Sequence, residues 1–240
     1  MYELKVAIVQ FPGTNCDRDT FHVLKDVLQA DAELVWHEDL GMDAFDSAII
    51  PGGFSYGDHL RAGVIAAYSP AIGQLRKANE DGKPILGICN GFQILVESGL
   101  LPGALLRNSN LRFVCRWVSI RVEEGSSLFT KFSKKGTILK MPIAHNEGRY
   151  YVEDNLLTSL ENNGQIVFKY VDEAGQPSDL SNPNGSVFNI AGISNREGNI
   201  VGLMPHPERA SESLLSPFKT TDGLQILRSM LRSVEVLLKR

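Results

Sequence analysis

One cysteine stands between two glycines, at the point where an apolar strand is expected to give way to a helix. Cys89 follows the apolar run 85–88, and the residues after Gly91 have the apolar spacing of a helix. A sharp turn of this kind lifts a nucleophile clear of the sheet, and Gly87 and Gly91 lack the side chains that would collide around it. The helix N-terminus would favour a thiolate. We predict that Cys89 is a reactive thiol; the alternative is a small buried hydrophobic residue.

A thiol nucleophile needs a base, and the segment 205–208 (Pro-His-Pro-Glu) offers one after an apolar run. Its prolines favour an extended backbone, in which His206 and Glu208 point to the same side. The carboxylate could then fix the imidazole tautomer while the other ring nitrogen acts on the thiol. We predict a triad of Cys89, His206 and Glu208. The alternatives are that the two late residues are merely solvated, or that His145 is the base. His37 lies in a polar loop, where we expect a solvated imidazole.

A glycine-rich turn follows a second buried strand. Residues 51–58 read Pro-Gly-Gly-Phe-Ser-Tyr-Gly-Asp, and glycines let backbone N–H groups approach a ligand closely. Phosphate-binding loops share this glycine spacing, but Asp58 and His59 stand where such a loop needs Lys and then Ser or Thr. We therefore predict an oxyanion hole, completed by the amide of Asn90, the residue after the nucleophile.

The elements that must position these groups alternate along the first half of the chain and become β-rich after Gly103. Strands are expected at residues 5–10, 33–36, 47–50, 84–88, 113–122, 138–143, 165–171, 190–194 and 200–204, and helices at 16–29, within 63–80, after residue 89 and at 224–238. Residues 195–199 are typical of a hairpin loop. The cores of the early strands are continuously apolar, as in strands covered by helices on both faces.

This pattern predicts an α/β fold of the flavodoxin-like type. We expect an open sheet that is mainly parallel at its centre, with added antiparallel strands and helices on both faces. Ligands bind such sheets beyond the carboxyl ends of the strands, which is where the loops after residues 9, 50 and 88 leave. No repeat or linker divides the chain, so we expect residues 1–240 to form a single domain.

Composition excludes several classes of function. A formal net charge of -4 without a basic run argues against a nucleic-acid partner. The N-terminal region carries neither a signal peptide nor a membrane span, so we expect a cytoplasmic protein with no membrane contact. Three cysteines in such a chain predict free thiols rather than disulfides. No pair of cysteines or histidines has the spacing of a zinc site, so we expect no metal.

The motifs together resemble those of the class I (triad) glutamine amidotransferases. The strings that carry the resemblance are Gly87-x-Cys89-x-Gly91-x-Gln93, Pro51-Gly52-Gly53 and Pro205-His206-Pro207-Glu208. Longer strings at 12–17, 51–58, 87–95 and 204–210 are similar to one subfamily, the glutaminase subunits of phosphoribosylformylglycinamidine synthases, and the resemblance runs from about residue 5 to residue 237. It implies the same triad, oxyanion donors at the amides of Gly53 and Asn90, and a glutamine pocket lined by Gln93 with His145 near it.

The resemblance also implies a reaction and partners. Glutamine would be hydrolysed to glutamate and ammonia through a cysteinyl thioester, and the ammonia would pass to an ATP-dependent synthetase that makes formylglycinamidine ribonucleotide in purine biosynthesis. The expected partners are a large synthetase subunit and a small third subunit. ATP and Mg²⁺ belong to the synthetase, and this chain is expected to hold no cofactor. The alternatives are a glutaminase for another ammonia acceptor, another cysteine hydrolase of related fold, or a non-catalytic interaction subunit.

Four further residues carry simpler expectations. We expect Cys16 to be a capping-turn residue without chemistry, because it stands at a predicted helix start. Cys115 lies in a β-like run and is expected in the core. Asp58 and Arg61 could face a partner subunit, although charged loop residues are usually solvated.

Overall fold

The structure is a computed structural model that describes residues 4–123 and 127–238. Its strands are β1 (Lys5–Gln10), β2 (Asp31–Trp36), β3 (Ser47–Ile50), β4 (Ile85–Ile88), β5 (Ala104–Leu106), β6 (Val114–Val122), β7 (Ile138–His145), β8 (Arg149–Tyr151), β9 (Ile166–Val171), β10 (Ile190–Ser194) and β11 (Ile200–Leu203). Nine of them form one sheet in the order β2-β1-β3-β4-β11-β10-β9-β6-β7, and β5 pairs with β8.

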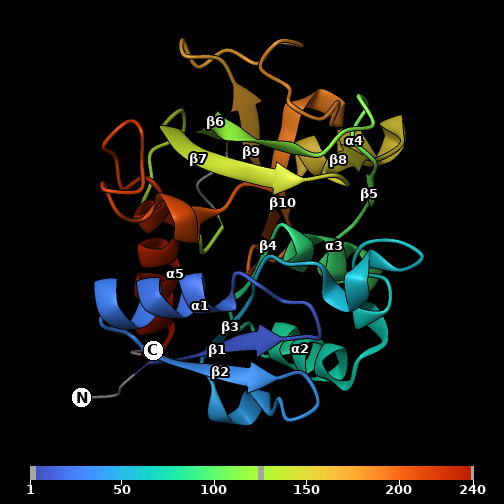
Figure 1. Cartoon of the computed structure of the whole chain (residues 1–240). Coiled ribbons are helices and arrows are strands. Elements are labelled where there is room, and N and C mark those ends of the chain that lie inside the picture. The colour runs from blue at the N-terminus through green and yellow to red at the C-terminus, as the bar shows by residue number, and fades with distance from the viewer. Residues whose placement is uncertain (1–3, 124–126, 239–240) are drawn as a thin grey trace.

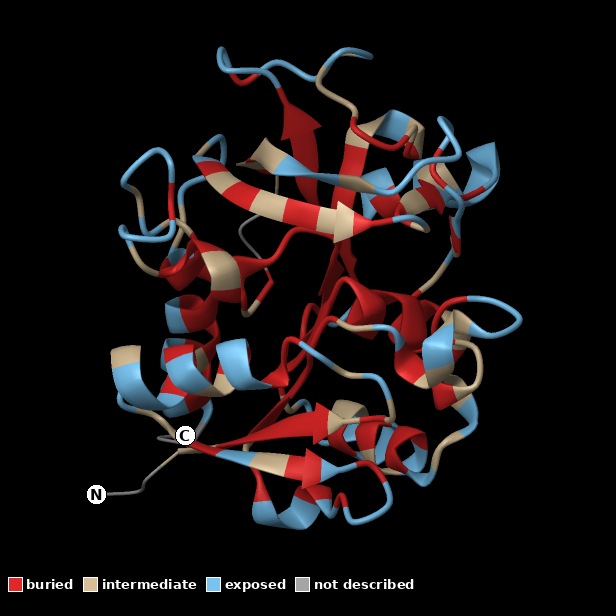
Figure 2. Ribbon diagram, in the orientation of Figure 1, coloured by how far each residue is buried: buried red, intermediate tan, exposed pale blue. Residues whose placement is uncertain are grey.

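The large sheet has a parallel part and an antiparallel part. Strands β2, β1, β3, β4 and β11 are parallel neighbours, and β11, β10, β9, β6 and β7 pair antiparallel. Every residue of β3, β4 and β11 is buried, and Figure 2 shows this buried zone running through the middle of the molecule. The predicted parallel centre with added antiparallel strands is confirmed.

Helices cover the sheet on both sides. They are α1 (Asp17–His22), α2 (Pro70–Glu80), α3 (Asn90–Glu97), α4 (Asp154–Asn162) and α5 (Gly223–Leu238). Helices α1 and α5 lie on one side of the parallel strands, and α2 and α3 lie on the other (Figure 1). This is the flavodoxin-like α/β arrangement that the sequence predicts. Among the described residues, no helix is long and apolar enough to cross a membrane.

Two helical segments differ from the sequence prediction. The helix expected at 16–29 is α-helical only as far as His22 and then π-helical over Val23–Val27. Helix α2 lies within the predicted range 63–80 and begins at Pro70, where Ser69 caps the first turn and proline fits without loss of a hydrogen bond. Helix α4 was not predicted, because Leu160 is its only buried residue and its apolar pattern is therefore faint.

The register of the parallel strands brings three loops to one edge of the sheet. Ile88 of β4 lies opposite Leu203 of β11, and Gly87 lies opposite Ile50 of β3. The residues that follow these strands therefore leave the sheet side by side. We refer to this as the carboxyl edge, and it is where a ligand site is expected in such a sheet.

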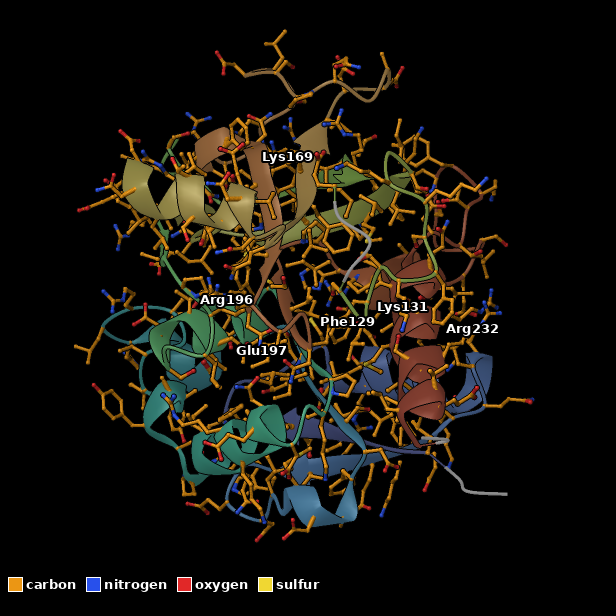
Figure 3. The ribbon with its side chains drawn as sticks, turned by 180° about the vertical axis from the view of Figure 1, so that it is seen from behind. Phe129, Lys131, Lys169, Arg196, Glu197 and Arg232 are labelled. Atoms are coloured by element: carbon orange, nitrogen blue, oxygen red, sulfur yellow. The ribbon has the colours of Figure 1, made fainter. Side chains whose placement is uncertain are left out.

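The hairpin predicted at residues 195–199 is confirmed, because β10 and β11 pair antiparallel with Ser194 opposite Val201. Arg196 and Glu197 mark this turn in Figure 3, which views the molecule from behind. Since β11 runs from this turn to the carboxyl edge, the hairpin lies at the opposite end of the sheet from the candidate site.

Candidate active site

Cys89 occupies a strained turn between β4 and α3. Its backbone angles are φ 51° and ψ −103°, a conformation that residues with a side chain rarely adopt and that marks functional turns. The flanking glycines are needed sterically. A Cβ atom on Gly91 would lie 2.0 Å from the carbonyl oxygen of Ile50, and one on Gly87 would lie 2.7 Å from the backbone of Gly91. The sharp turn predicted at this cysteine is present.

His206 and Glu208 form a buried pair after β11. The Nδ1 atom of His206 lies 2.6 Å from Oε1 of Glu208, and the two residues are 2% and 1% exposed. The contact was predicted, but the predicted extended backbone was wrong. His206 alone is extended, and Pro207–Ala210 form a 3₁₀ helix. Proline has the φ angle of a first helical residue, so Pro207 starts a tight turn that brings Glu208 back to the ring.

The charges around His206 favour its protonated form. Burial lowers the pKa of His206, but the negative charges of Glu208 and Cys89 outweigh burial and hold its pKa well above the ordinary value. Within the described residues, its Nε2 atom is buried and makes no hydrogen bond. Because Nδ1 is taken by Glu208, Nε2 is the nitrogen left to serve Cys89. The arrangement can hold an imidazolium beside a thiolate and deliver a proton to a leaving group.

The glycine turn after β3 is held by the segment that follows β1. The carbonyl oxygen of Gly52 accepts hydrogen bonds from the amides of Asn15 (3.3 Å) and Cys16 (3.1 Å). In a trans peptide the N–H and the C=O point in opposite directions. Because the Gly52 carbonyl faces Asn15 and Cys16, the Gly53 N–H points away from these two residues. The hydrogen bonds of the described residues include none from this amide. A Cβ atom on Gly53 would lie 2.7 Å from the Gly13 oxygen, so the fit requires glycine.

Asn90 and Gln93 belong to a buried polar chain that joins three segments. The Asn90 Oδ1 atom accepts the Ser55 amide at 3.1 Å, and its Nδ2 atom donates to Gln93 Oε1 at 2.9 Å. Gln93 Nε2 in turn donates to the carbonyl oxygen of Glu147 at 2.7 Å. The chain ties the glycine turn, the helix after Cys89 and the loop after β7 together. Gln93 thus lies in the first turn of the helix that follows Cys89, and its role in lining a glutamine pocket stays a prediction.

His145 ends β7 and is suited to a neutral role rather than that of the base. It is buried, and its Nε2 atom lies 3.1 Å from Asn184 Nδ2. An amide nitrogen only donates, so Nε2 is the acceptor and Nδ1 carries the proton. Burial and the charge of His206 lower the pKa of His145 to about 3. The carbonyl oxygen of the preceding Ala144 lies 3.6 Å from Cys89 Sγ, so this strand end borders the thiol.

Cys16 lies against the buried pair of His206 and Glu208, which sequence reasoning missed. Its sulfur, a ring nitrogen of His206 and an oxygen of Glu208 all lie within 4.8 Å of one another. Arg209 Nη2 is 3.2 Å from the sulfur, and a guanidinium at that distance opposes a metal cation, so we interpret the group as a thiol packed on the triad. The signal was available: Cys16 follows β1, whose end lies at the carboxyl edge.

Two other expectations were wrong. Cys115 is exposed, not part of the core. His37 was expected to be solvated in a polar loop, but it is buried, stacks on Phe11 with 5.1 Å between ring centroids and lies 2.7 Å from the hydroxyl of Ser69. Neither residue takes part in the candidate site.

Asp58 and Arg61 follow the glycine turn. Asp58 is half-buried, and its Oδ1 atom has no hydrogen-bond partner among the described residues. Burial and the nearby charge of Glu147 raise the pKa of Asp58 to about 6. Arg61 pairs with Glu97 of α3. Their contact with a partner subunit stays a prediction.

Comparison with known proteins agrees with this geometry. The sequence model for the CobB/CobQ-like glutamine amidotransferase domain matches residues 3–231. The chain is 53% identical over 227 residues to phosphoribosylformylglycinamidine synthase subunit PurQ of Methanosarcina acetivorans, and the aligned region covers 95% of this chain and 97% of that protein. It is 52% identical over 228 residues to the same subunit of Aquifex aeolicus, covering 95% and 99%.

Solved structures give the same result. A chain in the structure of PurLQS from Thermotoga maritima superposes with a TM-score of 0.83 and 41% identity, covering 96% of this chain and 99% of that one. The glutaminase domain of Trypanosoma brucei CTPS, solved with bound acivicin, superposes with a TM-score of 0.58 over 97% and 94% of the two chains. At 17% identity the second likeness indicates a shared fold alone.

Proposed function

This chain belongs to the CobB/CobQ-like glutamine amidotransferase domain family, and on that premise we propose that it is the glutaminase subunit of a phosphoribosylformylglycinamidine synthase. The identity of 53% to a PurQ subunit over 95% of the chain carries this proposal. The buried His206–Glu208 pair beside Cys89 supports it chemically. The chain hydrolyses glutamine to glutamate and ammonia, and the ammonia serves synthesis of formylglycinamidine ribonucleotide.

In the first half of the proposed reaction, the Cys89 sulfur attacks the side-chain amide carbon of glutamine. The oxygen of that amide becomes an oxyanion, which accepts hydrogen bonds from the Gly53 and Asn90 amides. His206 gives its Nε2 proton to the departing nitrogen, so ammonia leaves and a thioester remains. Preorganised donors of this kind need no rearrangement as the charge develops. The bonds to the Gly52 carbonyl and the Asn90 side chain supply that preorganisation.

In the second half, water attacks the thioester. His206 is now neutral at Nε2 and takes a proton from the water, while the same two amides hold the second oxyanion. The sulfur leaves as a thiolate and glutamate is released. Glu208 bonds to Nδ1 throughout, which fixes the ring and stabilises the imidazolium each time it forms. Gln93 and His145 are proposed to line the glutamine pocket.

The proposed partners are a large synthetase subunit and a small third subunit. The synthetase would hold ATP and Mg²⁺, and this chain would hold no cofactor. We place its action in the cytoplasm, as its free thiols suggest. We also propose that residues 1–240 act as one domain, since one continuous sheet takes its strands from Lys5 to Leu203.

The test uses the assembled complex with Cys89→Ala and, as a matched control, Cys115→Ala at the exposed thiol. With glutamine as nitrogen donor, Cys89→Ala should form no amidine product, because no thioester can form. With added ammonium salt it should keep synthesis close to wild type. Glutamine-dependent synthesis by Cys89→Ala would overturn the proposal. Glutaminase activity without amidine formation would point to another ammonia acceptor.

A further inference from the structure

Three residues form a tethered group behind the catalytic pair. Arg209, the residue after Glu208, donates from Nε to Asp19 Oδ2 at 3.1 Å and from Nη2 to Cys16 Sγ at 3.2 Å. Asp19 belongs to α1, and Cys16 immediately precedes that helix. The guanidinium is therefore fixed at two points, so its position relative to the triad is set by α1.

Glu208 needs compensation for its burial. Its Oε1 atom meets His206, but its Oε2 atom is buried and has no hydrogen-bond partner in the described part of the chain. A carboxylate with so few partners is costly to keep charged away from water. A second cation near Glu208 would offset that cost.

Arg209 is that cation. Burial lowers the pKa of Arg209, but the negative charges of Cys16, Glu208 and Asp19 outweigh it and raise the pKa above the ordinary value. The guanidinium therefore stays charged and interacts with Glu208, and the attraction acts equally on both partners. The other titratable groups around Glu208 come from its own loop, from the nucleophile turn and from the walls of the adjoining cavity: His206, Cys89, Cys16, Asp19, His22 and Glu212.

Cys16 joins this group to the ring of His206 and to the glycine turn. A Cβ atom built on Gly52 would lie 2.7 Å from His206 Cε1 and 3.0 Å from Cys16 Sγ, so the ring edge and the sulfur flank the same backbone position. Burial raises the pKa of the Cys16 thiol. As a thiol it donates to Asn15 Oδ1 at 3.1 Å and accepts from Arg209. Its sulfur thus closes the space beside the imidazole.

We propose that Arg209 is a positioning residue of the amidotransfer reaction, whose charge compensates the buried Glu208 carboxylate and so holds it against His206, with Asp19 and Cys16 holding the guanidinium in place. The inference rests on the proposed function, because it assigns Arg209 a part in the same triad. It explains why Arg209, whose chain neighbours Glu208 and Ala210 are buried, donates to the buried sulfur of Cys16 as well as to the exposed carboxylate of Asp19.

The experiment measures the pH profile of glutamine hydrolysis by the complex containing Arg209→Met or Arg209→Lys. Arg232→Met is the control, since Arg232 lies on α5 (Figure 3) with its guanidinium over the ring of Phe132. Removing a cation makes every nearby group hold its proton to higher pH. The acid limb and the basic limb of the pH profile of Arg209→Met should therefore both move to higher pH, by about one pH unit. Its kcat should fall by about tenfold with KM little changed. Arg209→Lys should return the limbs towards wild type.

Cys16→Ala provides a second variant, which leaves Arg209 and its charge in place but removes the contact with Nη2. It should shift both limbs of the pH profile in the same direction by less, and limbs at their wild-type positions in Cys16→Ala would contradict the tether. A loss of rate in Arg209→Met with unmoved limbs, or no loss at all, would overturn the inference. If the wild-type complex itself hydrolyses no glutamine, the proposed function fails instead, so the two failures are distinct.

Discussion

The Nδ1 atom of His206 lies 2.6 Å from Oε1 of Glu208, and both side chains are closed off from solvent. A hydrogen bond between charged partners at this distance is strong, and burial keeps water from competing for it. The carboxylate therefore decides which ring nitrogen faces Cys89. We therefore expect catalysis to depend on this bond, and Glu208→Gln tests it.

Glu208→Gln should abolish most activity while leaving the fold intact. The amide has nearly the shape of the carboxylate but carries no charge, so it neither fixes the ring tautomer nor stabilises the imidazolium. In a Ser-His-Asp triad the corresponding change costs about 10⁴ in kcat, and we expect a loss of roughly 10³ to 10⁴ here. Steady-state glutaminase assays and thermal unfolding measure the two effects. Glu197→Gln at the distant hairpin is the control, and a loss below about tenfold in Glu208→Gln would contradict the assignment.

Gly53→Ala should disable the oxyanion hole. The added methyl group would lie 2.7 Å from both the Gly13 oxygen and the Thr14 Cα atom, so the turn must move and the Gly53 amide moves with it. Loss of one oxyanion donor costs about 10²–10³ in kcat. Gly73→Ala in α2 is the matched control, since a methyl group there meets nothing within 4 Å. Equal kcat values for the two variants would rule out the Gly53 amide as a donor.

The sequence predicts the architecture of the chain and the local motifs of the site. It does not predict the strand order or the contacts between distant segments. The turn at Cys89 and the pair in Pro-His-Pro-Glu are contiguous motifs, so local rules reach them. The pairing of β11 with β4 was not predictable, because strand order depends on the whole sheet. The contact between Cys16 and Arg209 joins residues 193 positions apart. Only the general rule that loops collect at the carboxyl edge hints at it.

Errors in the prediction have local causes. Prolines on both sides of His206 suggested an extended chain, yet Pro207 equally suits the start of a helical turn, and the turn prevails. Cys115 was placed in the core because it stands in a β-like run, but β6 exposes that position. An aromatic neighbour, Phe11, draws His37 out of solvent.

Acid should destabilise the protein through His145. Its pKa is about 3 when folded and near 6.5 when unfolded, so between these values the unfolded chain binds more protons. Stability therefore rises with pH from about 3 to 6.5 and levels off above, by about 1.4 kcal/mol per pH unit from this residue. Chemical denaturation of wild type and His145→Gln at several pH values tests this. The difference in unfolding free energy between wild type and His145→Gln should change between about pH 3 and 6.5. A difference that stays constant over this range would contradict the prediction.

Asp58→Asn should stabilise the folded chain near neutral pH. Because the folded pKa of Asp58 is raised to about 6, its favourable contribution is complete below pH 4 and is lost as pH rises through 6. Above that, wild type holds a charge close to Glu147 that the amide lacks. The melting temperature of Asp58→Asn should exceed that of wild type at pH 7 and approach it at pH 4. A melting temperature of Asp58→Asn below that of wild type at pH 7 would contradict the prediction, because it would show that the Asp58 carboxylate stabilises the fold.

The most direct measurement traps the covalent intermediate. The complex is mixed with isotopically labelled glutamine, quenched in acid and digested, and each cysteine peptide is analysed by mass spectrometry. A γ-glutamyl group should be found on the Cys89 peptide, and none on those of Cys16 and Cys115. Glu208→Gln should slow its appearance, and Cys89→Ala should abolish it. Label on another residue, or steady hydrolysis of glutamine without label on Cys89, would contradict the account of this site.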